Sequence, residues 1–379
     1  MKILVDAIPM TGLLTGIARY LRNLYRMVDH LRLAGTAYFT GRQVTGTLPP
    51  LADSRQWQQM TRSVRRLPDP VVFGLRAARW LRYEHHLNRV CRNPESGISL
   101  YHETAFTPAR LTAVPTVFSM YDLSLRRYRD AHPRERVWLF EYFIKTRLRY
   151  ARHILTISEF IRNEIIDEFK VPQSMVTSVP LAPDPLFAPC SGSEIKAVKQ
   201  AYGLPDEFLL FVSSLEPRKN IALLMDALAA ADTDIPLVLA GWHGWGDKHW
   251  QQKMHSSRLR GRVFFTGHVP DSDLRALYAG ATALVYPSLY EGFGLPIVEA
   301  MACRCPVICA DTASMPEVAG DAALYIDPDR SDSLVHAIET LVHDDQVQQS
   351  LVNRGTARAG RFSWEKTARQ TIDLFRRLQ

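Results

Sequence analysis

The amino-acid sequence predicts an α/β protein built from two Rossmann-like domains. Its 379 residues are more than one ordinary hydrophobic core fills. Short apolar runs typical of buried strands alternate with segments of helical spacing over residues 2–179, and a second such series covers residues 208–326. Four prolines within residues 180–189 separate the two series and indicate a hinge. We therefore expect a first domain over residues 1–182 and a second domain over residues 190–362.

The first domain is predicted to begin with a buried strand over residues 2–8. A loop that ends at Gly16 leads into a helix, because apolar residues recur at helical spacing over residues 17–31. Arginine-rich helices are predicted within residues 57–92 and over residues 135–152. The other strands of this domain are predicted over residues 97–102, 116–120, 154–158 and 176–179.

The second domain contains a similar series of buried strands. They are predicted over residues 208–212, 235–239, 262–265, 283–286, 306–309 and 323–326. Because strands alternate with helices in both series, each sheet is expected to be parallel and covered by helices on both faces. A last helix is predicted over residues 363–378.

The composition is typical of a globular enzyme. Hydrophobic residues make up 46% of the chain and charged residues 22%, and no apolar run reaches the length that crosses a bilayer. The apolar run at the start is too short for a signal peptide, so we expect a cytoplasmic protein. Five cysteines, an odd number without a common zinc spacing, favour reduced thiols over disulfides.

The net charge of +7 is unevenly distributed along the chain. Residues 1–180 contain 27 Lys and Arg against 15 Asp and Glu, whereas the remainder contains 19 against 24. A basic first half favours an anionic partner, and we expect association with the anionic inner leaflet of the membrane; a solvated basic exterior is an equal alternative. No recognisable nucleic-acid motif accompanies the charge, so nucleic acid is not an expected partner.

The segment that contains Glu291 and Glu299 is the best candidate for a functional site. An apolar strand leads into a glycine-bearing loop, and Pro296 suits the first turn of the helix that follows. The free N–H groups of a helix N-terminus favour a phosphate group, and two flanking carboxylates suit the hydroxyls of sugars attached to it. The spacing alone allows equally well a surface turn with a capping acid and a solvated glutamate.

Residues 288–302 resemble the E-x7-E signature of glycosyltransferase family 4, the group 1 glycosyltransferases, which are retaining nucleotide-sugar transferases of the GT-B fold. Other segments resemble landmarks of that family in order and spacing: residues 215–220, 265–269, 315–318 and 362–365. The resemblance implies two facing Rossmann-like domains with a deep interdomain cleft, the first binding the acceptor and the second the nucleotide sugar. It also implies that the C-terminal helix, residues 363–379, crosses back to the first domain.

The resemblance further implies a donor site that needs no metal. Arg218 and Lys219 would neutralise the leaving diphosphate, Glu299 would accept hydrogen bonds from the ribose, and Glu291 would hold the transferred sugar. No protected carboxylate pair for double displacement is evident, so Glu291 and the two cations would act in catalysis through position and charge. The remaining donor-binding candidates are Gly16, His268, Val269, Gly292, Phe293, Gly294 and Leu295.

The first domain supplies the other candidates. Relatives commonly place a histidine before the aspartate that corresponds to Asp122, and this chain has Tyr121 there. A phenol can donate and accept a hydrogen bond, so both residues are assigned catalytic roles in the sugar or acceptor pocket. Arg19 and His102 are, with Asp122, the acceptor-binding candidates.

The leading hypothesis is a retaining, metal-independent hexosyltransferase that serves bacterial O-antigen or capsule biosynthesis. The first donor to test is GDP-mannose, and the acceptor would be lipid-linked or an oligosaccharide. The alternatives are a nucleotide-sugar 2-epimerase of the same architecture and a non-catalytic basic protein that binds lipid or nucleic acid. The D-x-D sequences at residues 271–273 and 327–329 are interpreted as helix caps or turns, so no metal or other cofactor is expected.

Overall fold

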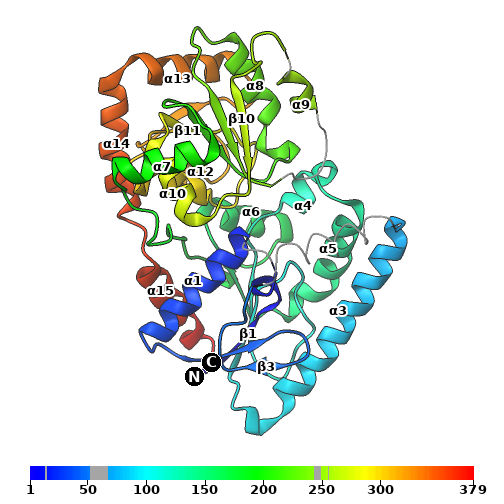
Figure 1. The fold of residues 1–379 in the computed structure, drawn as a ribbon. Coiled ribbons are helices and arrows are strands. Elements are labelled where there is room, and N and C mark those ends of the chain that lie inside the picture. The colour runs from blue at the N-terminus through cyan, green and yellow to red at the C-terminus, as the bar shows by residue number, and fades with distance from the viewer. Residues whose placement is uncertain (13–14, 52–66, 243–248, 255) are drawn as a thin grey trace. The chain divides into compact units, whose positions relative to one another are not determined.

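The computed structural model describes every residue except 13–14, 52–66, 243–248 and 255, and it divides the chain into two compact units (Figure 1). The first unit comprises Met1–Leu181 and Trp364–Gln379, and the second comprises Ala182–Ser363. The second unit therefore begins at the start of the proline-rich segment, and the last helix belongs to the first unit.

The first unit contains a seven-stranded sheet with the strand order β3-β2-β1-β4-β5-β6-β7. Its strands are β1 (Lys2–Asp6), β2 (Gly35–Phe39), β3 (Val44–Thr45), β4 (Leu100–Glu103), β5 (Thr116–Ser119), β6 (His153–Thr156) and β7 (Val176–Ser178). Among the described strands of this unit, only β3 is antiparallel, and it pairs with β2 at the edge. The expectation of a wholly parallel sheet is wrong at this edge, where a short hairpin adds a strand that has no buried apolar run.

The described α-helices of this unit are α1 (Gly16–His30), α3 (Asp69–Arg92), α4 (Ser124–Arg127), α5 (Arg134–Arg147), α6 (Glu159–Phe169) and α15 (Trp364–Arg377). Five 3-10 turns accompany them: η1 (Ile8–Met10), η2 (Pro94–Ser96), η3 (Arg129–Ala131), η4 (Leu148–Tyr150) and η5 (Gln173–Met175). The predicted arginine-rich helix over residues 57–92 lies partly outside the described residues, and its described part is α3.

Helices cover both faces of this sheet, because neighbouring residues of β4 point to opposite sides. The hydroxyl of Tyr101 lies 2.5 Å from that of Tyr83 in α3, and α5 packs against α3. The next residue, His102, contacts Tyr25 of α1 and the ring of Phe375 in α15. α3 and α5 therefore cover one face, and α1 and α15 cover the other.

The last helix is an integral part of the first unit. Thr367 in α15 donates a hydrogen bond to the carbonyl of Pro180 at 2.8 Å, and the side chain of Gln379 donates to Ser99 at 2.6 Å. The backbone N–H of Lys2 also donates to Ser99, so the two chain termini lie close together (Figure 1). The predicted return of the terminal helix to the first domain is confirmed.

The second unit contains a wholly parallel six-stranded sheet with the order β10-β9-β8-β11-β12-β13. The strands are β8 (Leu209–Val212), β9 (Leu237–Ala240), β10 (Val263–Gly267), β11 (Ala283–Tyr286), β12 (Val307–Ala310) and β13 (Leu324–Ile326). The described helices are η6 (Pro217–Lys219), α7 (Gly192–Tyr202), α8 (Ile221–Ala230), α9 (His249–Lys253), α10 (Asp271–Gly280), α11 (Leu295–Ala302), α12 (Met315–Ala319), α13 (Ser331–His343) and α14 (Asp345–Ala359).

Each sheet has a point at which the strand order reverses direction. In the first unit this point lies between β1 and β4, and in the second between β8 and β11. Open α/β sheets bind ligands beyond the carboxyl ends of the strands at such a point. The loops that follow β8 and β11 are therefore the natural place for a site in the second unit.

Candidate active site

The loops after β8 and β11 are held together by backbone and side-chain hydrogen bonds. The N–H of Leu289 donates to the carbonyl of Arg218 at 2.9 Å. Ser314, from the loop after β12, donates through its hydroxyl to the carbonyl of Glu291 at 2.9 Å. Three neighbouring strands thus fix the backbone of the loop that carries Glu291.

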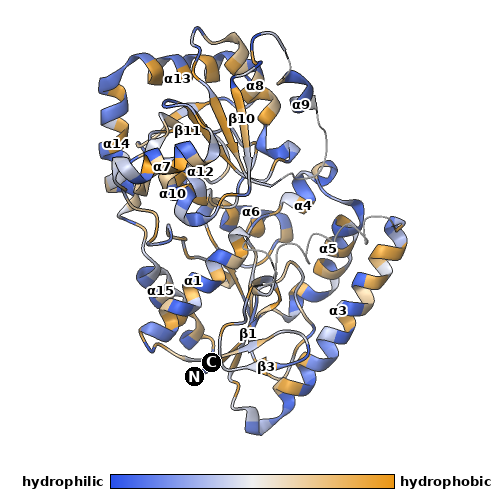
Figure 2. Ribbon diagram, in the orientation of Figure 1, coloured by the Kyte–Doolittle hydropathy of each residue, from blue (hydrophilic) through white to orange (hydrophobic). Residues whose placement is uncertain are grey.

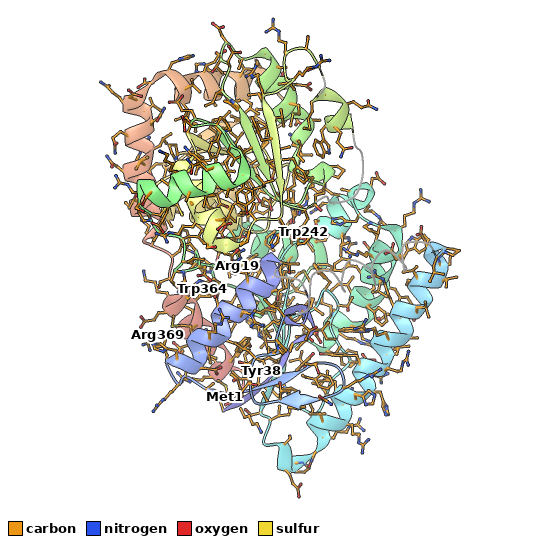
Figure 3. All side chains as sticks on the ribbon, in the orientation of Figure 1. Met1, Arg19, Tyr38, Trp242, Trp364 and Arg369 are labelled. Atoms are coloured by element: carbon orange, nitrogen blue, oxygen red, sulfur yellow. The ribbon has the colours of Figure 1, made fainter. Side chains whose placement is uncertain are left out.

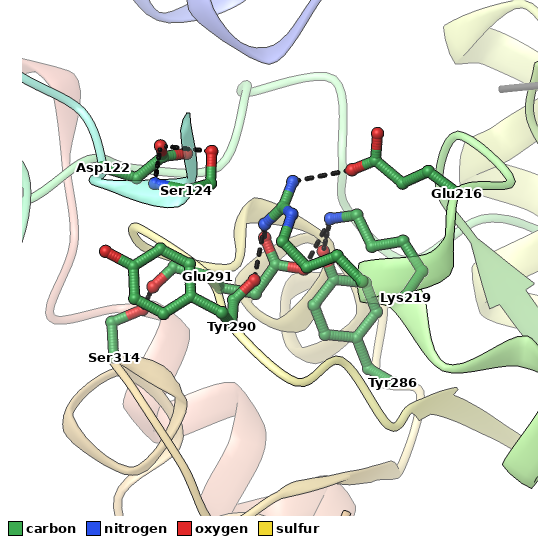
Figure 4. Close-up of polar contacts among 9 residues, drawn as sticks. Asp122, Ser124, Glu216, Lys219, Tyr286, Tyr290, Glu291 and Ser314 are labelled. Atoms are coloured by element: carbon green, nitrogen blue, oxygen red, sulfur yellow. Dashed lines mark hydrogen bonds and ion pairs between the residues drawn. The ribbon is translucent and has the colours of Figure 1, made fainter. Parts of the chain in front are cut away.

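The fold brings Glu291 into contact with both predicted cations (Figure 4). The Nζ of Lys219 lies 2.5 Å from Glu291 Oε1, and Arg218 Nη1 lies 3.4 Å from Glu291 Oε2. Arg218 also donates to the carbonyl of Tyr290 and, at 2.7 Å, to the carboxylate of Glu216. Lys219 is only 5% exposed and Glu291 only 7%, so this is a buried ionic cluster.

Burial and charge oppose one another in this cluster. Burial alone would raise the pKa of Glu291, but the charges of Lys219 and Arg218 outweigh it and lower that pKa to about 2. The pKa of Lys219 is also lowered, first by burial and then by repulsion from Arg218, since one carboxylate is shared between two cations. With Glu216, the four side chains carry two positive and two negative charges, so the cluster is neutral overall.

The sequence did not single out several partners of these residues. Glu216 lies within the segment already compared with the family, and its two-residue spacing from Arg218 was the available signal. Tyr286, at the end of β11, places its hydroxyl 3.4 Å from Lys219 Nζ and its ring beneath that ammonium. The contacts of Tyr286 with Lys219 and of Ser314 with Glu291 could not be inferred from spacing, because the two residues of each pair lie far apart in the sequence.

The helix that follows the loop begins as predicted. Gly294 adopts φ 96° immediately before α11, and a Cβ there would lie 3.1 Å from the side chain of Ile297. Pro296 occupies the first turn of α11. Glu299 lies inside this helix, is buried, and accepts a hydrogen bond from the hydroxyl of Tyr278 at 3.1 Å.

The remaining loop residues differ in their accessibility. Gly292 and Gly294 are buried, as is Phe293, whose ring packs edge-on against Phe362 at 5.7 Å, while Leu295 is partly exposed. Any role of Phe293 would therefore be exerted through its backbone, since its ring belongs to the core.

His268 and Val269 follow β10 at the carboxyl edge of the same sheet. His268 is exposed and stacks on Trp242 with ring centroids 4.5 Å apart and an interplanar angle of 16°, while Val269 is buried. Trp242 was missed by the sequence reasoning, although a tryptophan just after β9 was a usable signal. Two stacked rings present a flat surface of the kind that binds a nucleobase.

In the first unit, Gly16 is the exposed first residue of α1, which Thr15 caps by accepting a hydrogen bond from Ala18 N–H. Arg19 lies one turn further along α1 and is partly exposed (Figure 3). These two residues are in the positions that the sequence predicts at the start of the helix.

Tyr121 and Asp122 follow β5 at the carboxyl edge of the first sheet. Tyr121 is buried, and its hydroxyl donates to the carbonyl of Thr104 at 3.2 Å. Asp122 accepts from the N–H and hydroxyl of Ser124 at 2.9 and 2.7 Å, which fixes the start of α4. The hydroxyl of Tyr121 has its proton committed to Thr104 and could only accept a hydrogen bond from a ligand, whereas Asp122 is partly exposed.

The assignment of His102 to acceptor binding is wrong for this structure. His102 lies in β4 and is fully buried, with one ring nitrogen bonded to Tyr25 and the other 2.7 Å from the hydroxyl of Ser119. Burial lowers the pKa of His102 to about 3. Both imidazole nitrogens are used inside the core, because β4 is covered on this side by α1 and α15.

The D-x-D sequences lie beside helices. Asp271 is the first residue of α10 and Asp273 accepts from Tyr202 at 3.0 Å, but the N-cap position itself is Pro270, so neither aspartate is the predicted cap. Asp327 accepts from the N–H of Asp329 at 2.9 Å in a turn before α13. Among the described residues, no three His, Cys, Asp or Glu side chains are grouped so that they could hold a metal ion.

A second pair of buried acids lies at the carboxyl edge of the first sheet. Asp6 ends β1 and Glu103 ends the neighbouring β4. Thr104 donates to the carbonyl of Asp6 at 2.7 Å, and Tyr101 donates to Glu103 Oε2 at 3.0 Å. Burial raises the pKa of Asp6 and raises that of Glu103 well above its ordinary value, which the charge of Asp6 raises further.

Glu103→Gln is expected to stabilise the protein increasingly as the pH rises from 5 to 8. The native state keeps a proton on Glu103 where the unfolded chain, with a pKa near 4.5, has lost it, so wild-type stability falls as the pH rises through that range. Glutamine carries no such cost, and we expect a gain of ~1–3 kcal/mol at pH 8. Thermal unfolding of both proteins at pH 5 and pH 8 measures it, with Glu95→Gln as an exposed control. A loss of stability at pH 8 would show that Glu103 is ionised in the folded protein.

Comparison with solved structures identifies the fold. The fold resembles that of Anabaena HepE, crystallised in complex with UDP and glucose, with a TM-score of 0.73, 20% identity and 99% coverage of both chains. It also resembles WaaG, a glycosyltransferase involved in lipopolysaccharide biosynthesis, with a TM-score of 0.72, 13% identity and 99% coverage of both chains. The chain has the GT-B fold of glycosyltransferases.

Sequence comparison identifies the family. The sequence model of the protein family "Glycosyl transferases group 1" matches residues 194–358 of this chain. The O-antigen chain mannosyltransferase B of Escherichia coli is 39% identical over 285 residues, which are 74% of this chain and 74% of that relative. The chain belongs to the group 1 glycosyltransferases, as the resemblance of residues 288–302 implies.

Proposed function

We propose that this protein transfers mannose from GDP-mannose to a growing O-antigen chain, with retention of anomeric configuration and without a metal ion. The observation that carries this proposal is the 39% identity to an O-antigen chain mannosyltransferase over most of both chains. The first unit would bind the lipid-linked or oligosaccharide acceptor, and the second the nucleotide sugar. The enzyme would work at the cytoplasmic face of the membrane.

The buried ionic cluster supports a metal-independent reaction. Arg218 and Lys219 are already paired with Glu216 and Glu291 at the point where the strand order reverses. A donor diphosphate would compete with these carboxylates for the cations, which would free Glu291 to accept hydrogen bonds from the sugar. The cations would then neutralise the charge that develops on the leaving diphosphate.

The experiment that tests this function supplies GDP-, UDP-, dTDP- and ADP-sugars to the purified protein, with and without EDTA, in the presence of an oligomannose acceptor on a lipid carrier. We expect transfer from GDP-mannose alone, an α-linked product by NMR, and unchanged turnover in EDTA. Transfer from another donor would refute the proposed sugar. Conversion of the nucleotide sugar without acceptor would instead indicate a 2-epimerase, and activity restored only by manganese or magnesium would refute the metal-independent mechanism.

Glu299→Ala and Glu291→Ala are expected to affect different kinetic constants. A ribose is held alike in the ground and transition states, so loss of Glu299 should raise the KM for the donor with little change in kcat, whereas loss of Glu291 should mainly lower kcat. Steady-state kinetics with varied donor separates the two effects. Tyr278→Phe removes the hydroxyl bonded to Glu299 but keeps the carboxylate, and it should change neither constant more than about threefold. Unchanged kinetics in both alanine variants would remove these glutamates from the site.

The proposed membrane surface is narrower than the distribution of arginines suggests. Arg126 and Arg127 pair with Glu168 at 3.0 and 3.1 Å, and Arg147 pairs with Glu84 at 2.9 Å. These charges are therefore neutralised within the protein, as is Arg76, which lies 3.5 Å from Glu135. Arg62, Arg65 and Arg66 lie outside the described residues. Arg79 and Arg82 of α3 are exposed and form no ion pair with a described carboxylate, so we place the proposed membrane surface on this helix.

The outer side of α3 combines positive charge with exposed apolar groups. Figure 2 shows hydrophobic and hydrophilic residues interspersed along this helix. Val71 and Leu75 are 47% and 56% exposed, and Arg79 and Arg82 follow on the same side. Such a surface would rest at the headgroup level of an anionic bilayer. The described helices include none that is long and apolar enough to span a membrane.

Arg79→Glu combined with Arg82→Glu is expected to weaken binding to vesicles that contain phosphatidylglycerol by at least about tenfold. Each basic residue near an anionic leaflet contributes on the order of 1 kcal/mol, and two charges are reversed. Liposome flotation at rising salt measures the effect. Lys196→Glu with Arg260→Glu makes the same charge change in the second unit and should leave binding within about twofold. Equal binding of wild type to neutral vesicles would refute the proposed surface.

A further inference from the structure

A groove of about 900 Å³ lies at the amino-terminal edge of the first sheet. Its walls come from the C-terminal half of α3, from the loop before β5 and from η4, which precedes β6. Arg89, Arg92 and Arg110 line it together with Leu81 and Tyr150. We call it the arginine groove. It lies at the opposite end of the strands from the carboxyl edge that carries Tyr121 and Asp122.

The arginine groove concentrates positive charge that the protein does not neutralise. Arg89, Arg92 and Arg110 are exposed, and none of them forms an ion pair with a carboxylate in the described part of the chain. Glu84 also lines the groove, but its carboxylate is bonded to Arg147 at 2.9 Å and to the backbone N–H of Arg110. Three neighbouring guanidiniums without a counter-charge favour the binding of an anion.

The groove is held in place by hydrogen bonds that span its two walls. Asn88 in α3 donates to the carbonyl of Arg110 at 2.9 Å, and buried Glu84 accepts the Arg110 N–H. The guanidinium carbons of Arg110 and Arg149 lie 5.7 and 5.2 Å from the centre of the Tyr150 ring. The backbone of Arg110 is therefore fixed before any ligand binds, and its guanidinium already lies against the Tyr150 ring, which reduces the entropic cost of binding.

The lining indicates the chemistry of the ligand. One guanidinium can bind two oxygens of a phosphate at once. Arg89 and Arg92 are three residues apart and therefore lie on one face of α3. Leu81, which is 49% exposed, and the Tyr150 ring add apolar surface beside the charges. We propose that the arginine groove binds the phosphate or diphosphate group of a lipid. This inference does not depend on the sugar donor or on the reaction.

The test measures binding of two soluble probes to the full chain at constant ionic strength by isothermal titration calorimetry. The probes are inorganic pyrophosphate and dihexanoyl phosphatidic acid below its micellar concentration. We expect saturable binding of the lipid probe that is at least about fivefold tighter than that of pyrophosphate. Arg89→Gln with Arg110→Gln should weaken it at least about tenfold, and the thermal unfolding of this variant without ligand should be unchanged, because both side chains are exposed.

Lys196→Gln with Arg260→Gln is the matched control, because it removes two exposed charges of the second unit that do not line the groove. It should change the affinity for either probe less than about twofold. Equal loss in the control and groove variants would show that only overall charge matters and would overturn the site. Pyrophosphate binding that is as tight as lipid binding, and that the groove variant weakens to the same extent, would identify free phosphate or diphosphate as the ligand of the groove and refute the lipid. The absence of saturable binding of either probe to wild type would overturn the proposal altogether.

Discussion

Lys219→Met is expected to lower the turnover number at least about 100-fold, because the leaving diphosphate would lose a buried cation. The same change should reduce the free energy of unfolding by ~3 kcal/mol, since the Glu291 carboxylate is then buried with one cation in place of two. The effect on kcat should far exceed that of EDTA. Steady-state kinetics and guanidinium unfolding of the second unit measure both quantities.

The double variant Lys219→Met with Glu291→Gln tests whether the loss of stability comes from the buried carboxylate that has lost its partner or from the altered packing. It removes both charges of the 2.5 Å pair, so stability should largely return while activity stays low. Lys253→Met removes a lysine from an ion pair of similar length with Asp226, but this pair is exposed, and the change should cost less than about 1 kcal/mol. Equal losses in the free energy of unfolding for Lys253→Met and Lys219→Met would show that burial does not increase the cost of breaking the ion pair.

The pH dependence of the same cluster has a definite sign. The folded-state pKa of Glu291 is about 2 against an ordinary value of 4.5, so its pairing stabilises the protein above pH 4.5. This contribution, ~3 kcal/mol at most, is lost as the pH falls from 4.5 to 2. In Lys219→Met, the free energy of unfolding should therefore fall less steeply than in wild type as the pH is lowered from 4.5 to 2.

Gly241→Ala is expected to destabilise the second unit by more than about 3 kcal/mol. Gly241 follows β9 with φ 151°, and a Cβ there would lie 1.8 Å from the carbonyl oxygen of Ser213 in the loop after β8. The oxygen that this Cβ would meet belongs to the backbone and not to a flexible side chain, so the backbone at these two strand ends would have to move. Thermal unfolding measures the loss of stability, and donor binding should weaken as well, because Ser213 leads into the loop of Arg218.

Gly192→Ala provides the matched control in the same unit. A Cβ at Gly192 would have no atom within 4 Å, and the residue begins α7, where alanine is the better helix former. Its stability should be unchanged or slightly raised. If Gly241→Ala were equally harmless, the close approach of the two strand ends would not be an essential part of the native structure.

Much of the local structure could be predicted from the sequence. The buried strands of the second unit are short apolar runs between turn residues, and all six were predicted within about two residues of their observed ends. The strand, loop and helix around Glu291 were predicted because Gly294 and Pro296 have backbone preferences that act locally. β2 and β3 were missed, since a short edge hairpin need not contain a continuous apolar run.

The roles of polar residues were less predictable. His102 was assigned to the acceptor site at the end of a predicted strand, yet its ring is buried on a face of the sheet that α1 and α15 cover. The basic first half of the chain was expected to meet a membrane, but several arginines of α4 and α5 are paired with glutamates of distant elements. The sequence contains the charges of these residues but not their distances from one another.

The sequence by itself determined where most of the strands lie and where the chain divides, because backbone preferences and hydrophobic periodicity act over a few residues. Only the tertiary structure decided that Lys219 contacts Glu291, which lies 72 residues further along the chain. It also decided which charges are buried and which remain exposed. The free energy of a charge depends on its neighbours and its exposure to water, and both are set by packing between segments that are far apart in sequence.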